Sequence, residues 1–185
     1  MKLLGISGSL RAGSYNSKVL QTASKVLPDG VELEMFDSLK LVPPYDEDDD
    51  TDPAPPAVAR LRTAIAGADV LLIATPEYNA SIPGQLKNAL DWVSRPEATN
   101  VLRNKPVAVV GASTGAFGAV WAQAELRKVL ATAGARVVVG EVAVGRADNR
   151  FDANGRLIDE NLREQLQEVV EALVVEAAPA VPVAA

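Results

Sequence analysis

Short apolar runs alternate along the chain with longer segments in which apolar residues return every three or four positions. This alternation is typical of an α/β fold, because each buried strand is followed by an amphipathic helix that returns the chain along one face of the sheet. The apolar runs predict five strands, at Leu3–Ile6, Val31–Phe36, Val70–Ala74, Val107–Val110 and Val137–Val144. The periodic segments predict five helices, at Asn16–Leu27, Ala57–Ala66, Gly84–Arg95, Gly118–Ala133 and Asp159–Glu176. We expect a three-layer sandwich with helices on both faces of a five-stranded parallel sheet.

The patterns within the strands indicate their places in the sheet. Residues 70–73 and 107–110 are apolar without interruption, which is typical of central strands buried on both faces. Residues 31–35 alternate between apolar and polar, which is typical of an edge strand. A strand order of 2-1-3-4-5 fits both observations. In such a sheet a ligand binds beyond the carboxyl ends of the strands, between the first and the third, where the order reverses.

Three loops are expected to meet at that edge: the first loop (residues 7–17), the second loop (75–84) and the third loop (112–118). The first loop places small polar residues before a helix start, where N–H groups and the helix dipole favour a phosphate. Gly8 and Gly13 have P-loop spacing, but Ser14-Tyr15 replaces the Lys-Ser/Thr pair, and the dinucleotide fingerprint is also missing. A mononucleotide remains as the ligand, with an ordinary helix cap as the alternative.

The second and third loops complete a possible pocket for a flat ring. Pro76 and Pro83 stiffen the second loop around Tyr78 and Asn79, which predicts a rigid platform; a plain turn with Tyr78 packed on its neighbours is the alternative. The third loop brings glycine to a helix start, so that backbone can approach a ligand closely, and a capped helix start is again the alternative. Together the three loops predict a pocket for a phosphate tail and a planar ring.

Composition narrows the chemistry. The 185 residues are 48% hydrophobic, which suits one domain, expected over 1–176 with a flexible tail at 177–185. The chain has no cysteine and no histidine, which excludes thiol nucleophiles, histidine triads and the usual zinc ligand sets.

The net charge of the chain is −6, which disfavours nucleic acid and anionic membranes as partners. The N-terminus enters a strand at once, so we expect a cytoplasmic protein without membrane insertion. The acidic run at 47–50 is interpreted as a solvated loop, and no metal is assigned.

The chain resembles the NAD(P)H-dependent FMN reductase family, which is flavodoxin-like and includes quinone, chromate and azo reductases. The resemblance rests on motifs in a specific order: GSLR at 8–11 with SYN at 14–16, PEYN at 76–79, IPG at 82–84, LKNA at 86–89 and DW at 91–92. It implies non-covalent FMN, hydride transfer from NAD(P)H to the flavin N5, and two-electron reduction of a quinone, flavin, azo dye or metal oxyanion in a ping-pong sequence. Neither the acceptor nor the choice between NADH and NADPH follows from it.

Residues are carried over from the family onto matching positions of this chain. The resemblance implies that the FMN phosphate is held by Ser9, Arg11, Ser14, Asn16 and Ser17, with Arg11 as the only cation there. It implies that the isoalloxazine is lined by Pro76, Glu77, Tyr78 and Asn79 on one side and by Ser113, Gly115 and Ala116 at the other edge. No protein group is assigned a catalytic role, because the flavin carries the redox chemistry.

Relatives assemble as dimers or tetramers, so the resemblance implies a homodimer or a homotetramer. Where many relatives have a second glycine and an arginine after the position of Gly118, this chain has Ala119-Val120-Trp121, which puts the tetramer in doubt more than the dimer. Five residues are assigned to packing or dimer contact: Lys87, Asn88, Asp91, Trp92 and Arg95. Two other functions use the same fold: a flavodoxin-like electron carrier, and a flavin-binding regulatory protein without appreciable turnover. The scarcity of aromatic residues in the three loops favours an open flavin over a carrier.

Overall fold

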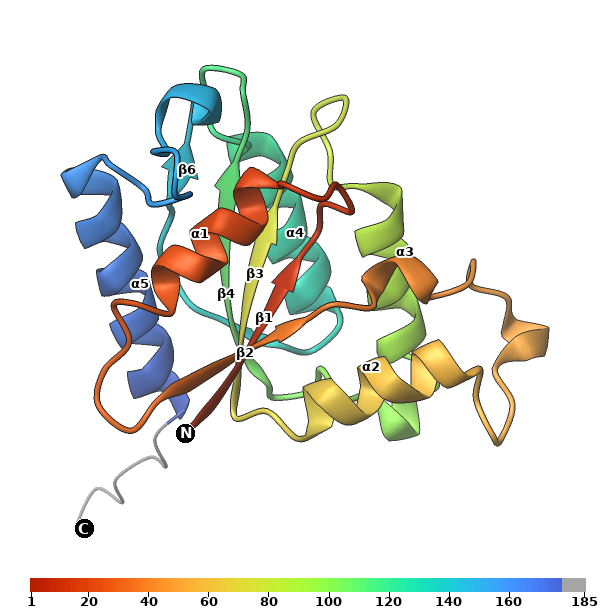
Figure 1. The fold of residues 1–185 in the computed structure, drawn as a ribbon. Coiled ribbons are helices and arrows are strands. Elements are labelled where there is room, and N and C mark those ends of the chain that lie inside the picture. The colour runs from red at the N-terminus through yellow and green to blue at the C-terminus, as the bar shows by residue number, and fades with distance from the viewer. Residues whose placement is uncertain (178–185) are drawn as a thin grey trace, which may run out of the picture.

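The computed structural model describes residues 1–177 and contains one parallel sheet of order β2-β1-β3-β4-β5, with β6 also paired to β4 (Figure 1). The strands are β1 (Lys2–Ser7), β2 (Glu32–Phe36), β3 (Val70–Thr75), β4 (Pro106–Ala112), β5 (Arg136–Val137) and β6 (Ala143–Val144). The predicted order is confirmed, with β2 at the edge and every residue of β3 and β4 buried. The predicted tail lies outside the described residues except for Ala177, which ends the last helix.

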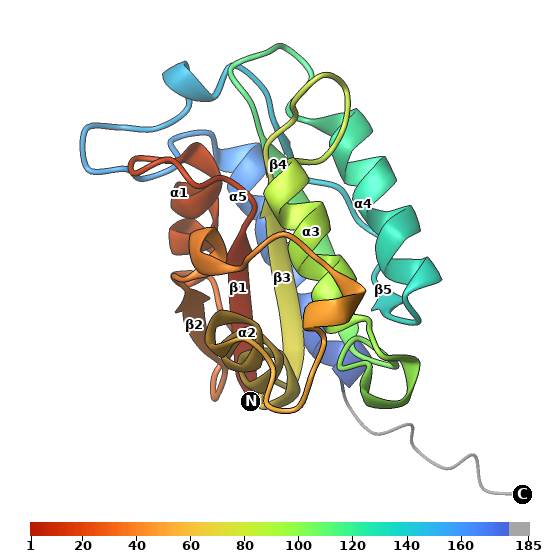
Figure 2. The same cartoon turned by 90° about the vertical axis from the view of Figure 1, so that its right-hand side faces the viewer.

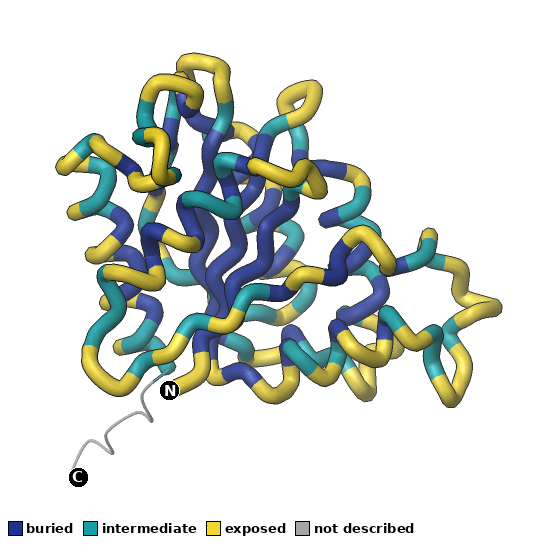
Figure 3. Tube along the Cα trace, in the orientation of Figure 1, coloured by how far each residue is buried: buried dark blue, intermediate teal, exposed yellow. Residues whose placement is uncertain are grey.

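Two helical layers cover the sheet, as the sequence pattern predicted (Figures 1 and 2). Because successive side chains of a strand point to opposite faces, Leu4 and Ile6 pack with α2, α3 and α4, whereas Leu3 packs with α1 and α5. The helices are α1 (Tyr15–Ala23), α2 (Pro56–Ala66), α3 (Gly84–Val93), α4 (Val120–Thr132) and α5 (Glu160–Ala177). Figure 3 shows the buried strands between the more exposed helical layers. The described part of the chain contains no helix long and apolar enough to span a membrane.

The beginning of α4 differs from the prediction, which started this helix at Gly118. Gly118 and Ala119 have φ values of 59° and 64°. These left-handed conformations cannot continue into a right-handed helix, so α4 starts at Val120. The helix therefore begins two residues further from the predicted ligand edge.

The predicted fifth strand, 137–144, is wrong as one continuous element. Val107 of β4 pairs with Val137, and Gly111 pairs with Ala143, so four steps along β4 correspond to six along the edge. The two extra residues break the pairing into β5 and β6 and leave Val139 95% exposed. Apolar composition alone predicted an uninterrupted strand, because it carries no information on register.

The acidic run at 47–50 is exposed, as predicted, over its first three residues, but its last residue is partly buried. A short helical turn spans Glu47–Asp49, and the side chain of the next residue, Asp50, is only 9% exposed. Its carboxylate accepts a hydrogen bond of 2.9 Å from Arg62, which also donates to the carbonyls of Trp92 and Arg95. Asp50 thus fastens the segment to α2 and to the end of α3. Within residues 1–177 no cluster of acidic side chains is arranged to hold a metal ion.

Candidate functional site

The first loop forms an N-terminal cap on α1. The hydroxyl of Ser14 accepts hydrogen bonds from the N–H groups of Asn16 (3.1 Å) and Ser17 (3.5 Å). This arrangement is the ordinary capping geometry for serine, and it satisfies two of the free N–H groups at the start of the helix. Gly13, with a φ of 57°, allows the chain to turn into the cap, and the space on its Cβ side is open. The cap that was the alternative prediction is therefore present, and the backbone beside it at Gly13 is open.

Asn16 joins the first loop to the end of β4. Its Nδ2 donates to the carbonyl of Ala112 at 3.0 Å, and its Oδ1 accepts from the N–H of Ala112 at 2.9 Å. The side chain is buried, and its oxygen and nitrogen both face the same backbone unit. Asn16 was predicted to contact a phosphate, and its side chain instead bonds to the strand that leads into the third loop.

Arg11 is exposed at the tip of the first loop, and its guanidinium lies 5.2 Å from the ring centre of Tyr15. The Nζ of Lys18 lies at the same distance from that ring, and Tyr15 stacks on Phe151 with 5.6 Å between the ring centres. Lys18, on α1, therefore brings a second cation close to the first loop, and the prediction of Arg11 as the only cation at the phosphate stays a prediction. Lys18 was missed because it lies one helical turn beyond Ser14, outside the loop motif.

The tip of the second loop is a tight two-residue turn. Tyr78 and Ser81 exchange backbone hydrogen bonds of 3.0 and 3.1 Å, and Asn79 and Ala80 between them have φ values of 52° and 60°. Positive φ at both central residues defines a type I′ turn, in which asparagine is favoured. Pro76 is buried, whereas Tyr78 is 53% exposed. The turn was predicted as an alternative, but the packing of Tyr78 on its neighbours that went with it is not observed.

Glu77 reaches from the second loop to the start of α4. Its Oε2 accepts hydrogen bonds from the N–H groups of Trp121 and Ala122, each at 3.1 Å. Both donors belong to the first turn of the helix that follows the third loop. The sequence motif predicted Glu77 at a flavin ring, and it contained no signal for this contact across 44 residues of chain.

The third loop is held against the segment that follows β6. The N–H of Ala147 donates to the carbonyl of Ser113 at 3.0 Å, and the N–H of Arg146 donates to that of Gly115 at 2.8 Å. The hydroxyl of Ser113 accepts from the N–H of Gly115 at 3.1 Å. Ala116 lies nearby, at the rim of a hollow of about 340 Å³ that also contains Arg146. The three predicted residues of this loop therefore lie together on a stiff backbone.

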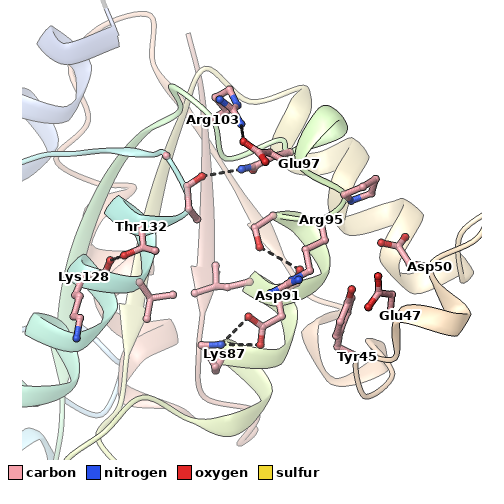
Figure 4. Close-up of a pocket in the computed structure, with 17 residues that line it drawn as sticks. Tyr45, Glu47, Asp50, Lys87, Asp91, Arg95, Glu97, Arg103, Lys128 and Thr132 are labelled. Carbon is pink, nitrogen blue, oxygen red and sulfur yellow. Dashed lines mark hydrogen bonds and ion pairs between the residues drawn. The ribbon is translucent and has the colours of Figure 1, made fainter.

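A larger cavity, of about 890 Å³, lies between the later turns of α3 and α4 (Figure 4). Its walls carry both signs of charge, including the pair Lys87–Asp91 at 2.7 Å and the pair Arg103–Glu97 at 2.9 Å. None of the twelve residues predicted to bind the cofactor lines this cavity. It is therefore separate from the edge where the three loops meet.

The fold and this edge define a flavodoxin-like α/β protein whose three polar loops are joined at the carboxyl ends of β1, β3 and β4. The chain belongs to the NADPH-dependent FMN reductase family, whose model matches residues 1–149. It is 48% identical over 174 residues to an NAD(P)H-dependent FMN reductase of Pseudomonas aeruginosa, covering 94% of this chain and 93% of that protein. It is 40% identical over 169 residues to a 2-hydroxy-1,4-benzoquinone reductase of a Burkholderia species, covering 90% and 91%.

The fold agrees with a solved structure of a relative. The flavoenzyme NAD(P)H:(acceptor) oxidoreductase of Paracoccus denitrificans has a TM-score of 0.83 at 34% sequence identity, with 95% of this chain and 96% of that chain covered. The predicted family, fold class and reductase activity are confirmed by these similarities. The predicted binding residues stay a prediction, which the geometry above refines.

Proposed function

We propose that this reductase binds FMN non-covalently at the carboxyl edge of the sheet, accepts hydride from NAD(P)H, and reduces a quinone-type acceptor. The observation that carries the proposal is the joining of the three loops. Asn16 fastens the first loop to the end of β4, and Glu77 fastens the second loop to α4. Loops that are bonded to one another in this way form a preorganised site, because their relative positions do not have to be ordered when a ligand binds.

The chemistry of the first loop suits a phosphate. The start of α1 provides N–H groups and a partial positive charge, and Arg11 provides an exposed guanidinium. Hydroxyl donors are available at Ser9, Ser14 and Ser17. We assign these three serines and Arg11 to the phosphate and give Asn16 the role of holding the loop in place.

The second and third loops suit a flat ring. The type I′ turn at 78–81 and the buried Pro76 make the second loop stiff, so that backbone at Pro76, Glu77, Tyr78 and Asn79 can lie against the ring. Ser113, Gly115 and Ala116 can meet its other edge. FMN, when bound, supplies the hydride acceptor at N5. The protein orients the ring and provides its electrostatic environment. No histidine or cysteine is needed for this role.

The openness of the edge supports a ping-pong order of events. Tyr78 and Phe117, the aromatic residues of the second and third loops, are 53% and 63% exposed, so neither is packed down over the site. An open ring face can receive nicotinamide and acceptor in turn, which is the basis of a ping-pong sequence. Two relatives act on NAD(P)H or a quinone by name, which supports the same substrates here.

We include a homodimer, or a homotetramer, and a cytoplasmic location in the proposal. The cavity between α3 and α4 supports self-association, because its charges of both signs can pair with those of a second copy. Sedimentation velocity of the purified protein tests the assembly, and a monomer at micromolar concentration would contradict it.

The function is tested by the absorbance of purified protein mixed with FMN, first under anaerobic addition of NADH or NADPH and then of a simple quinone. We expect the flavin band to bleach with the nucleotide and to recover with the quinone. Steady-state rates at several fixed quinone concentrations should give parallel double-reciprocal lines; intersecting lines would contradict the ping-pong sequence. FMN that binds but stays oxidised would instead indicate an electron carrier or a regulatory protein.

A further inference from the structure

The helix α4 starts without a cap from its own flank. The residue before it, Ala119, is in the left-handed conformation and has no side chain that can accept a hydrogen bond from the first turn. Its first N–H groups therefore need an acceptor from elsewhere. Glu77 supplies one, at 3.1 Å from both Trp121 and Ala122.

This contact joins the second loop to the helix that follows the third loop, and these two parts otherwise depend on separate supports. The third loop is bonded to the segment after β6, through Ser113 and Gly115. The tip of the second loop is closed by its own turn between Tyr78 and Ser81. Among the described residues, the bonds of Glu77 are the hydrogen bonds that connect positions 76–81 to another loop or helix.

The carboxylate is well suited to this task. It lies at the N-terminus of a 13-residue helix, where a negative charge is favourable, and both of its hydrogen bonds are charge-assisted. Glu77 is half-buried, so water competes with these bonds less than it would at an exposed cap.

We propose that Glu77 is a positioning residue: its carboxylate fixes the spacing between the second loop and α4, and so the width of the gap in which the flavin ring lies. The inference rests on the proposed function for the identity of the ring. It differs from the role implied by family resemblance, because the side chain acts through α4 and leaves the ring contacts to the backbone of the second loop.

The test compares Glu77→Ala with Glu77→Gln, which keeps one oxygen acceptor of nearly the same reach. Loss of two charge-assisted bonds is expected to weaken FMN binding by about tenfold or more in Glu77→Ala, whereas Glu77→Gln stays within about threefold of the wild type. FMN dissociation constants are measured by quenching of flavin fluorescence. The rate of flavin reduction at saturating NAD(P)H, measured by stopped flow, should fall in Glu77→Ala and be restored by the glutamine.

A control separates this role from simple stabilisation of the fold. Leu173→Ala, at a fully buried position of α5 on the opposite face of the sheet, lowers the melting temperature without touching the three loops. Its FMN affinity should equal that of the wild type. If Glu77→Ala binds FMN as Leu173→Ala does, Glu77 is only a helix cap; if Glu77→Gln loses as much affinity as Glu77→Ala, charge rather than spacing is decisive. Either result overturns the proposal.

Hydrogen exchange gives a readout that does not depend on flavin. In the protein without FMN, Glu77→Ala should speed amide exchange both in 76–81 and at the start of α4, while Glu77→Gln changes it little. Faster exchange in α4 alone would overturn the link between the loops. Wild-type protein that binds no FMN would contradict the proposed function, and the exchange result would still decide whether Glu77 joins the two segments.

Discussion

Asn16 and Ala112 are bonded to each other twice, by hydrogen bonds of 3.0 and 2.9 Å across 96 residues of chain. The pair connects the first loop, at the start of α1, to the end of β4. Since both groups of the Ala112 backbone are buried, the asparagine provides partners that water would otherwise have to supply. The asparagine therefore helps to fix the position of the first loop relative to the third.

Asn16→Ala should destabilise the fold and weaken cofactor binding together. It leaves a buried N–H and a buried carbonyl without partners, which costs about 2 to 4 kcal/mol of unfolding free energy. Urea unfolding measures this loss of stability. FMN titration measures the rise in the FMN dissociation constant that a less firmly held loop should cause. Asn16→Asp is the matched control, because it keeps an acceptor for the Ala112 N–H but loses the donor. An Asn16→Ala variant with wild-type stability would contradict the role of this pair.

Arg11→Gln should weaken FMN by about tenfold to a hundredfold, as expected for the loss of one charge-assisted contact to a phosphate. Riboflavin lacks the phosphate, so its affinity should stay unchanged, and the comparison isolates the phosphate contact. The salt dependence of FMN binding should also become shallower in the variant. Equal losses for FMN and riboflavin would show that Arg11 acts on the loop rather than on the phosphate. Lys18 is the second cation near Tyr15, and the variant Lys18→Gln measures its contribution to FMN affinity.

Gly118→Ala should destabilise the protein severely. A Cβ at this position would overlap the carbonyl group of Ala143, and the φ of 59° is unfavourable for alanine. We expect a loss of at least about 3 kcal/mol, from strain and from the forced separation of the third loop from β6. Gly84→Ala is the control: it lies at the first residue of α3 with open space around it, and should be neutral or stabilising by up to about 1 kcal/mol. Equal midpoints for the two variants in urea would contradict this account.

Lys105 should make a contribution to stability that rises at alkaline pH. Burial lowers the pKa of its ammonium below the ordinary value near 10.5, and the charge of Asp69 opposes the shift only in part. The folded chain therefore binds this proton less tightly than the unfolded chain, and the contribution of Lys105 to stability increases as pH rises through its lowered pKa toward 10.5. Lys105→Met should remove the rise. The test is to measure the urea midpoints of the wild type and of Lys105→Met from pH 7 to 10.5. Parallel curves of midpoint against pH would contradict the assignment to Lys105.

Local sequence patterns predicted much of the architecture. Uninterrupted apolar runs identified β3 and β4 as central strands, and the alternation in 31–35 placed β2 at the edge. The motif at 8–16 indicated the helix cap that Ser14 forms. These features were predictable because strand burial and helix capping depend on residues within a few positions of one another.

The contacts that assemble the site depended on the tertiary structure. Asn16 and Glu77 matched family motifs as ligand contacts, yet their side chains bond to Ala112 and to the start of α4. The register shift between β5 and β6 and the ion pair of Asp50 with Arg62 were equally hidden. The sequence by itself determined the order of strands and helices, since periodicity and capping are local properties. Which loops are joined, and through which atoms, was decided only when folding brought distant backbone groups within hydrogen-bonding distance.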